Sequence, residues 1–228
     1  MRKFKKVIIY SILILSTNTI YSQNVVRFYN EYHKNQLLKG IKERYKTVEG
    51  TPYMYGDFLS GDVRVERDQT YIYKALIRYN MYMNEMEFKD ESGQVYLLKP
   101  PEGMKEIVLN DKTFIHSDFI ENGESGDSYF SRMNDGHYKF LIRKKVVLLE
   151  AEREEPYKPA RPARFHQEED KYFVKKDDSP AFYLKKVNKL KDIFPEKRDV
   201  ITKYLKSNKV RTRDLESLIK LFEHINKD

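Results

Sequence analysis

Apolar and polar positions alternate with a period of two between about residues 50 and 151. Asp62–Glu66 alternates strictly, much of Ile72–Tyr79 does so too, and Tyr79–Phe88 pairs large residues with polar ones. Such alternation is typical of strands with one face in a core and the other in water. The pattern therefore predicts antiparallel strands over this stretch, and nothing in it resembles alternating strands and helices.

Residues that favour turns separate the predicted strands at a spacing of roughly ten residues. They are Ser60-Gly61, Arg67 to Gln69, Asp90 to Gly93, Pro100 to Gly103, Asn110-Asp111, Glu121 to Ser128 and Asn134 to Gly136. Short strands at this spacing indicate a meander that packs as a sandwich or curls into a half-barrel.

The stretch His137–Ala151 is the longest with strand character. It contains the basic triplet Arg143–Lys145 followed by a continuously apolar run, which predicts two strands joined by a bend at the triplet. Farther along, Tyr172–Lys176 and Ala181–Lys186 predict a hairpin whose turn is Asp177–Pro180.

A spacing near 3.6 residues predicts helices at both ends of the mature chain. Apolar residues recur from Val25 to Tyr45 and predict an N-terminal helix that ends at Gly50. Pro195 suits the first turn of one C-terminal helix, and Asp214 suits the first turn of another. The apolar stripes of these two helices are Val200, Ile201, Tyr204 and Leu205, and Leu215, Leu218, Ile219, Phe222 and Ile225.

Together these patterns predict an α+β fold: a mainly antiparallel β meander, preceded by one helix and followed by two. The predicted divisions are a signal peptide (1–22), an N-terminal helical segment (23–49), an antiparallel β domain (50–151), a proline-rich connector and hairpin (152–187) and a C-terminal helical pair (188–228).

The first 22 residues have the pattern of a cleavable secretory signal peptide. Four basic residues stand among the first six, and Val7–Leu15 is apolar apart from Tyr10 and Ser11. As a helix, the apolar run Val7–Leu15 is shorter than the thickness of the hydrocarbon core of a bilayer, about 30 Å. Cleavage after Ser22 is therefore favoured over a retained membrane anchor. We therefore expect an exported protein, periplasmic or associated with the outer membrane.

Composition adds two limits. The chain of 228 residues has no cysteine, which excludes disulfides, thiol nucleophiles and cysteine-ligated metals. Its formal net charge is +8, and removal of the four basic residues of the leader leaves +4. The remaining bases are interleaved with acids, which favours a solvated surface over a nucleic-acid site.

Several sequence blocks resemble a group of exported proteins of Bacteroidetes-type bacteria. The resemblance spans most of the mature chain, implies an envelope protein with this layout and brings no catalytic residues with it. The blocks are Gly50-Thr51-Pro52-Tyr53, Arg78 to Tyr82 leading into Glu85 to Phe88, Asp111 to Phe114, and Ala160 to Phe165, followed by the paired helices.

No motif meets the requirements of a catalytic or metal site. Gly126-Asp127-Ser128 resembles the nucleophile segment of trypsin-like proteases, but Tyr129 and Phe130 follow where that segment has two glycines, so a polar hairpin loop accounts for it. The histidines, His33, His116, His137, His166 and His224, show no metal-ligand spacing. We therefore assign no catalytic residue, no metal and no cofactor.

The proline-rich connector supplies the candidate contact surface. Prolines hold Pro156–Phe165 extended and ordered, which lowers the entropy cost of binding. Arginine and aromatic residues are enriched at interface hot spots, so the candidate contact residues are Tyr157, Arg161, Arg164 and Phe165. The alternative is that this segment only bridges two parts of the fold, lying flat with Phe165 buried.

Two functions follow from these expectations. The first is a non-enzymatic binding or assembly module of the cell envelope that takes a protein partner. The alternative is a periplasmic carrier of a lipid or other apolar ligand inside a curled sheet; a glycan ligand also stays open, and nucleic acid is not expected. The sequence leaves the oligomeric state undetermined.

Overall fold

The computed structural model describes residues 45, 47–66, 69–98, 100, 103–157 and 159–227. The predicted signal peptide and nearly all of the predicted N-terminal helix lie outside these residues. At the end of that predicted helix, Tyr45 and 47–49 form turns and a bridge, so the helical prediction has no support there.

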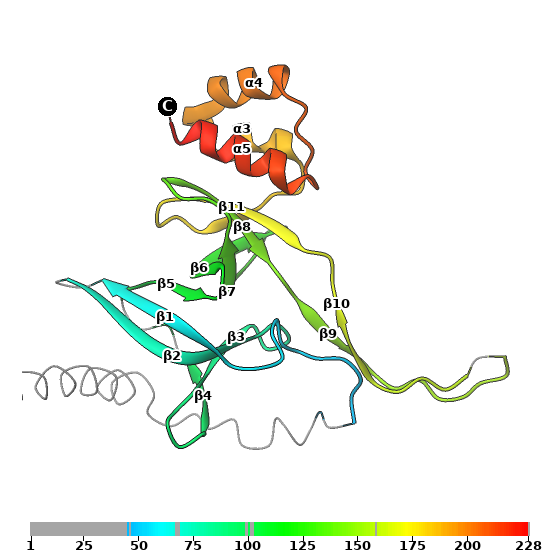
Figure 1. Cartoon of the computed structure of the whole chain (residues 1–228). Helices are drawn as coiled ribbons and strands as arrows, with labels where there is room; N and C mark the ends of the chain where they lie inside the picture. The colour runs from blue at the N-terminus through cyan, green and yellow to red at the C-terminus, as the bar shows by residue number, and fades with distance from the viewer. Residues whose placement is uncertain are drawn as a thin grey trace, which may run out of the picture.

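The described residues form a β-rich fold followed by helices (Figure 1). The strands are β1 (Leu59–Glu66), β2 (Thr70–Asn80), β3 (Glu85–Lys89), β4 (Val95–Leu98), β5 (Met104–Leu109), β6 (Lys112–Glu121), β7 (Glu124–Arg132), β8 (Tyr138–Arg143), β9 (Val146–Leu149), β10 (Arg164–Gln167), β11 (Lys171–Lys176) and β12 (Ala181–Tyr183). The helices are α3 (Leu190–Ile193), α4 (Arg198–Ser207) and α5 (Leu215–Ile225), with 3-10 turns η1 (Val187–Lys189) and η2 (Pro195–Lys197). The prediction of mainly antiparallel strands is confirmed.

Several predicted turns and strands differ in extent from the structure. The predicted turn Ser60-Gly61 lies inside β1, where Gly61 pairs with Ala75 and Leu109. The predicted strand Ala181–Lys186 ends at Tyr183. The predicted loop from Glu121 to Ser128 is wrong, because Asn122 and Gly123 alone make the turn and Glu121 pairs with Glu124. Both turn residues have positive φ, 52° and 91°, which matches the tight hairpins that twisted strands favour. The predicted run Tyr79–Phe88 is also interrupted, because 81–84 form a turn that ends at Asn84, with φ 57°.

Five strands close into a barrel. β6, β7, β8, β11 and β12 pair in succession, and β12 returns to pair in parallel with β6, with Ala181 opposite Phe119. The interior contains rings that contact one another edge-on: the centroid of Phe173 lies 5.0 Å from that of Phe130 and 5.7 Å from that of Phe119. Ile115, Leu141, Ala181 and Tyr183 complete this cluster. The barrel interior is therefore packed with side chains.

The other half of the sheet curls around a second core. Its strands follow β6 in the order β5, β1, β2, β3 and β4, and its buried face includes Val63, Ile77 and Phe88. The curl brings β4 back to β7, where the Tyr129 hydroxyl donates to the Leu98 carbonyl oxygen at 3.0 Å. The predicted sandwich is not observed, and in place of the predicted half-barrel five strands close into a complete barrel with the remaining strands curled beside it.

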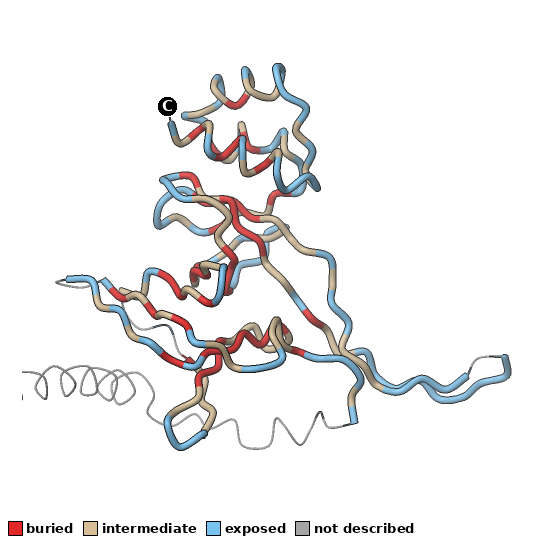
Figure 2. Tube along the Cα trace, viewed as in Figure 1, coloured by how far each residue is buried: buried red, intermediate tan, exposed pale blue. Residues whose placement is uncertain are grey.

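The helices cover the outside of the barrel. Phe222 of α5 stacks on Phe140 of β8 with ring centroids 5.6 Å apart, and Leu218, Leu221 and Ile225 are buried beside it (Figure 2). The predicted C-terminal pair corresponds to α4 and α5, and the short α3 precedes it. Among the helices of the described residues, none has the length and apolar character needed to span a membrane.

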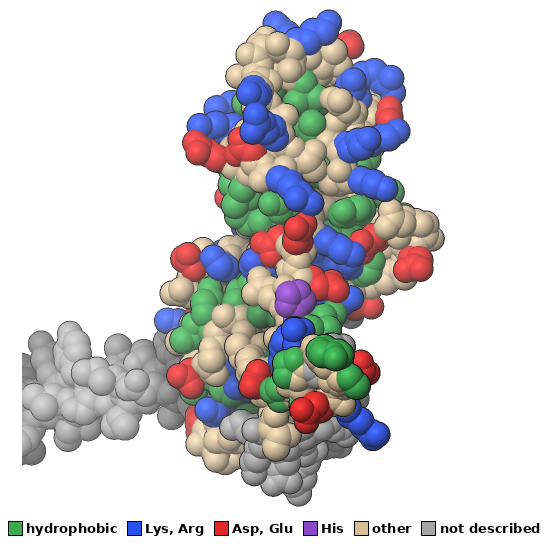
Figure 3. All heavy atoms as spheres, turned by 90° about the vertical axis from the view of Figure 1, so that its right-hand side faces the viewer, with side chains coloured by type: hydrophobic (Ala, Val, Ile, Leu, Met, Phe, Trp, Pro, Cys, Tyr) green, Lys and Arg blue, Asp and Glu red, His purple; other side chains and the backbone are tan. Residues whose placement is uncertain are grey.

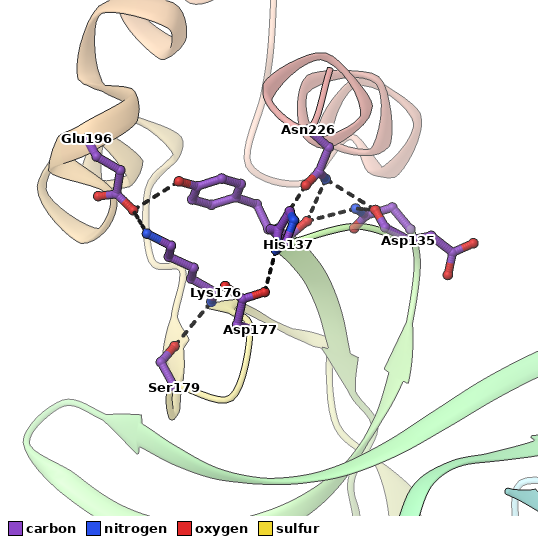
Figure 4. Close-up of polar contacts among 9 residues, drawn as sticks. Asp135, His137, Lys176, Asp177, Ser179, Glu196 and Asn226 are labelled. Atoms are coloured by element: carbon purple, nitrogen blue, oxygen red, sulfur yellow. Dashed lines mark hydrogen bonds and ion pairs between the residues drawn. The ribbon is translucent and has the colours of Figure 1, made fainter. Parts of the chain in front are cut away.

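Polar contacts fix α5 and the η2 segment to one end of the barrel (Figure 4). The Asn226 side chain accepts from the Tyr138 backbone N–H at 2.9 Å and donates to its carbonyl oxygen at 2.8 Å, as a neighbouring strand does. Glu196 accepts from Lys176 at 2.7 Å and from the Tyr138 hydroxyl at 3.0 Å. The contacts of Asn226 and Glu196 explain how the helices hold a fixed position on the barrel. At the same end, His137 pairs with Asp177 at 2.7 Å and joins two turns of the barrel itself.

Candidate functional site

The proline-rich connector forms a hairpin arm that projects from the molecule (Figure 1). We call residues 146–167 the arm. At its base β9 and β10 pair with Arg164 opposite Leu149. Farther out, Glu152 and Arg161 exchange two backbone hydrogen bonds of 2.8 and 3.0 Å. The chain reverses near Tyr157, which has a positive φ of 68° and a fully exposed side chain.

The four residues selected from the sequence divide between the two ends of the arm. Tyr157 and Arg161 are exposed on the outer part, which has solvent on both faces (Figure 2). Arg164 and Phe165 lie at the base and are partly buried. The structure therefore places Tyr157 and Arg161 on the same projecting segment but does not bring all four residues into one surface.

Aromatic packing anchors the base of the arm. The Phe165 ring contacts Tyr45 and Tyr82, with centroids 5.1 and 5.4 Å apart. Its backbone N–H donates to the Glu49 carbonyl oxygen at 2.8 Å. Gly50 has φ +80°, and a side chain there would approach the Phe165 carbonyl oxygen to 3.2 Å, so glycine permits this close contact. Phe165 therefore has a structural role in fixing the arm to the curled sheet.

Charge differs between the outgoing and the returning half of the arm. Glu150, Glu152, Glu154 and Glu155 lie on the outgoing half, with Arg153 as its one basic residue, whereas Arg161 and Arg164 lie on the returning half. In the described part of the chain, no ion pair involves Arg153, Arg161 or Arg164. Arg153 and Arg161 are exposed, so carboxylates of a partner can reach them.

A cleft of about 490 Å³ lies between the mouth of the barrel and the turn that joins β2 to β3. Its basic wall is the triplet Arg143–Lys145 together with Lys171, and its other wall carries Glu124 and Asp127 of β7. The sequence predicted only a bend at the triplet. The other residues that line this cleft lie far from the triplet in the sequence, so no local pattern predicts the cleft.

Basic side chains of this cleft already form ion pairs with carboxylates of the fold. Glu121 accepts from Arg143 and, at 2.5 Å, from Lys171. Burial acts to raise the pKa of Glu121, but the Lys171 hydrogen bond and the Arg143 charge outweigh it and lower that pKa. The Arg143 guanidinium also lies 4.4 Å from the Phe119 ring centroid. This group therefore closes one end of the packed barrel.

The residues considered for catalysis have structural partners. Ser128 lies within β7, not in a loop, and its hydroxyl donates to the Asn84 side-chain oxygen at 2.9 Å. His116 contacts Asp127 at 2.9 Å and packs edge-on against Tyr129. Ser128 and His116 face opposite sides of the sheet, because residues 116 and 129 are paired. Hence they do not form a nucleophile and base.

Metal ligands are not gathered in the described part of the chain: there, no group of three or more His, Asp or Glu side chains is positioned to hold an ion. Tyrosines of β2 serve packing. Tyr79 is buried, and Tyr71 and Tyr73 have parallel rings with centroids 6.3 Å apart.

Comparisons with protein-family models, with curated proteins and with solved structures found no match to this chain. The argument for function therefore rests on the fold, on the arm and on the charges of the surface.

Proposed function

We propose that this protein is an exported binding or assembly module of the cell envelope, without enzymatic activity, and that the arm receives its protein partner. One observation carries the proposal: the arm projects from the rest of the described fold (Figure 1), and its Tyr157 is fully exposed. A two-stranded hairpin alone is only marginally stable in water. A projecting ribbon of this kind is best accounted for by a partner that covers it.

The chemistry of the arm suits a groove on a folded protein. Tyrosine supplies a large contact area at low entropy cost, and Arg161 supplies planar hydrogen bonding to carboxylates. Three prolines, Pro156, Pro159 and Pro162, restrict the backbone before binding. A partner with an aromatic-lined groove and acidic groups near Arg161 would complement these features.

The packed interior favours this function over a carrier of apolar ligands. A carrier needs room for its ligand inside the sheet, as in barrels that hold small molecules. In this fold, a cluster of seven hydrophobic side chains packs the barrel interior, and the curled sheet is filled by a second cluster that includes Ile77, Met86 and Phe88. Binding at an outer surface fits these cores better.

The test is loss of partner capture without loss of stability. We expect Tyr157→Ala with Arg161→Ala to reduce capture of the envelope partner by at least about tenfold, since each is a hot-spot type. Melting temperature should change little, because both side chains are exposed. Ile72→Ala with Lys74→Ala is the matched control, since it removes an exposed apolar and an exposed basic side chain from β2.

Two results would contradict the proposal. One is capture that is unchanged in the arm variant. The other is a large fall in melting temperature with capture intact in the folded fraction, which would assign the arm a bridging role. Native mass spectrometry that found bound lipid in place of a protein partner would favour the carrier.

Export is tested separately. We expect the protein in the envelope fraction to begin near Gln23, because the basic start and short apolar run fit a cleaved leader. N-terminal sequencing decides this, and a protein that retains Met1 would show that the leader is not removed.

A further inference from the structure

Positive charge is concentrated in the C-terminal helices. Residues 185–228 contain thirteen Lys and Arg against seven Asp and Glu, a formal net charge of +6. Because residues 23–228 together carry +4, residues 23–184 carry −2. On the face from which the arm projects, basic side chains gather over the helical part of the molecule (Figure 3). The molecule is therefore electrically polarised along its length.

One part of this charge lies on α4 and the link to α5. Lys203 and Lys206 are exposed and three residues apart, so they lie on neighbouring positions of one helix face, opposite the buried Ile201. Lys209 and Arg211 follow in the exposed link. We call these four residues the basic cap.

The basic cap is not neutralised by the fold. Elsewhere on the helices, Lys189 pairs with Asp192 at 3.3 Å, and Lys220 pairs with Glu216 at 2.6 Å. By contrast, within the described residues no ion pair involves a residue of the basic cap. Asp199 is exposed near the start of α4 and is the nearest acid on that helix. The cap therefore retains a positive potential toward solvent.

We propose that the basic cap binds an anionic lipid bilayer, with α4 facing the headgroups. Each Lys or Arg close to an anionic membrane adds about a fivefold factor to binding. The exposed positions of α4 are charged or polar, and those of the link that follows include Lys209 and Arg211, so this surface can lie on anionic headgroups without inserting into the bilayer.

Two features favour lipid over nucleic acid. Proteins that hold single strands present aromatic side chains on which bases stack, and the exposed positions of α4 are charged or polar. The arrangement of α4 and α5 also leaves both helices packed on the barrel through their apolar stripes, so neither is free to enter a groove of the duplex. Binding to a broad anionic surface requires neither stacking side chains nor a helix that can enter a groove.

Flotation of the mature chain with vesicles tests the proposal. We expect binding to vesicles with about 30% phosphatidylglycerol, no binding to neutral phosphatidylcholine, and loss on raising the salt from about 50 to 500 mM, since screening weakens exposed charges. The triple variant Lys203→Gln, Lys206→Gln, Lys209→Gln should bind about 100-fold more weakly.

A matched control distinguishes an effect of the basic cap on binding from an effect of the net charge. The control variant Lys74→Gln, Lys105→Gln, Lys112→Gln removes three lysines from strands β2, β5 and β6, so its net charge equals that of the cap variant. This control should bind as the unchanged protein does, and both variants should keep its melting temperature. The arm variant should also bind vesicles normally, so this inference and the proposed function can fail independently.

Four results would overturn the inference. They are absence of binding to anionic vesicles, equal losses in the cap and control variants, binding that is insensitive to salt, and tighter binding to duplex DNA or heparin than to vesicles at the same salt concentration.

Discussion

Lys175 is the most unusual single residue of the barrel. It is 7% exposed, lies on the same face of β11 as Phe173 and donates to the Ser117 hydroxyl at 2.8 Å. Burial, aided by the charge of Lys139, lowers the pKa of Lys175. A buried lysine in such a position costs stability when it is protonated.

We expect Lys175→Met to raise the free energy of unfolding by about 1 kcal/mol at neutral pH. The unfolded chain binds more protons than the folded one between the lowered pKa and the ordinary value of 10.5, so the stability of the unchanged protein rises with pH in that window. The advantage of the methionine should therefore shrink as pH approaches 10.5. Denaturant unfolding across pH checks this, and Lys175→Met that is destabilising at neutral pH would contradict it.

At the residue scale, the sequence predicted which side chains are chemically able to act but not what they touch. Of the four residues selected as partner contacts, Tyr157 and Arg161 are exposed, and the role of all four stays a prediction. The triplet Arg143–Lys145 was noted only as a bend. Its partner Glu121 lies 22 residues from Arg143 and 50 from Lys171, and no local pattern encodes such contacts.

At the scale of elements, the junction between α5 and the barrel depends on Gly136. Its φ is +109°, and a side chain there would lie 2.5 Å from the Asn226 amide carbon. Gly136→Ala should lower the free energy of unfolding by about 2–4 kcal/mol, because backbone strain and this clash add. Gly123→Ala is the control, since it has φ +91° but no heavy atom near, and should cost only about 1 kcal/mol. Equal costs in the two variants would show that Asn226 does not constrain the junction.

The seam between β4 and β7 depends on one hydroxyl. Tyr129→Phe removes the hydrogen bond to the Leu98 carbonyl oxygen and should cost about 1 kcal/mol, with faster amide exchange in β4. Tyr183→Phe is the control, since in the described part of the chain no hydrogen bond involves its half-buried hydroxyl. Unchanged exchange in β4 would mean that the seam is held by packing alone.

Elements with a strong local period were predictable from the sequence, and the closure of the barrel was not. Alternation predicted β1, most of β2 and the hairpin of β11 and β12, but the first half of β7 was predicted as a loop. The basic triplet predicted the bend before β9, and the apolar stripes predicted α4 and α5. The barrel closes through two residue pairs between β12 and β6, which are about sixty residues apart in the chain. A three-residue strand has too short a pattern to reveal its partner, and the short α3 escaped prediction for the same reason.

At the scale of the whole molecule, three parts have different surfaces. The packed barrel and curled sheet form the scaffold, the arm extends to one side, and the helices carry the positive charge (Figure 1, Figure 3). Net charge alone suggested a weakly basic solvated protein. The charge difference between residues 23–184 and 185–228 indicates a charged surface only because the latter fold as one layer over the barrel, which the sequence did not show.

The central claim is that the arm contacts a protein partner, and site-specific photo-cross-linking in living cells tests it most directly. A photoreactive amino acid replaces Tyr157 at the exposed tip of the arm, and in a second strain it replaces Ile72, which is 55% exposed on β2. The account predicts one discrete protein adduct from position 157 and none of that size from position 72. The same adducts from both positions, or no protein adduct from position 157, would contradict it.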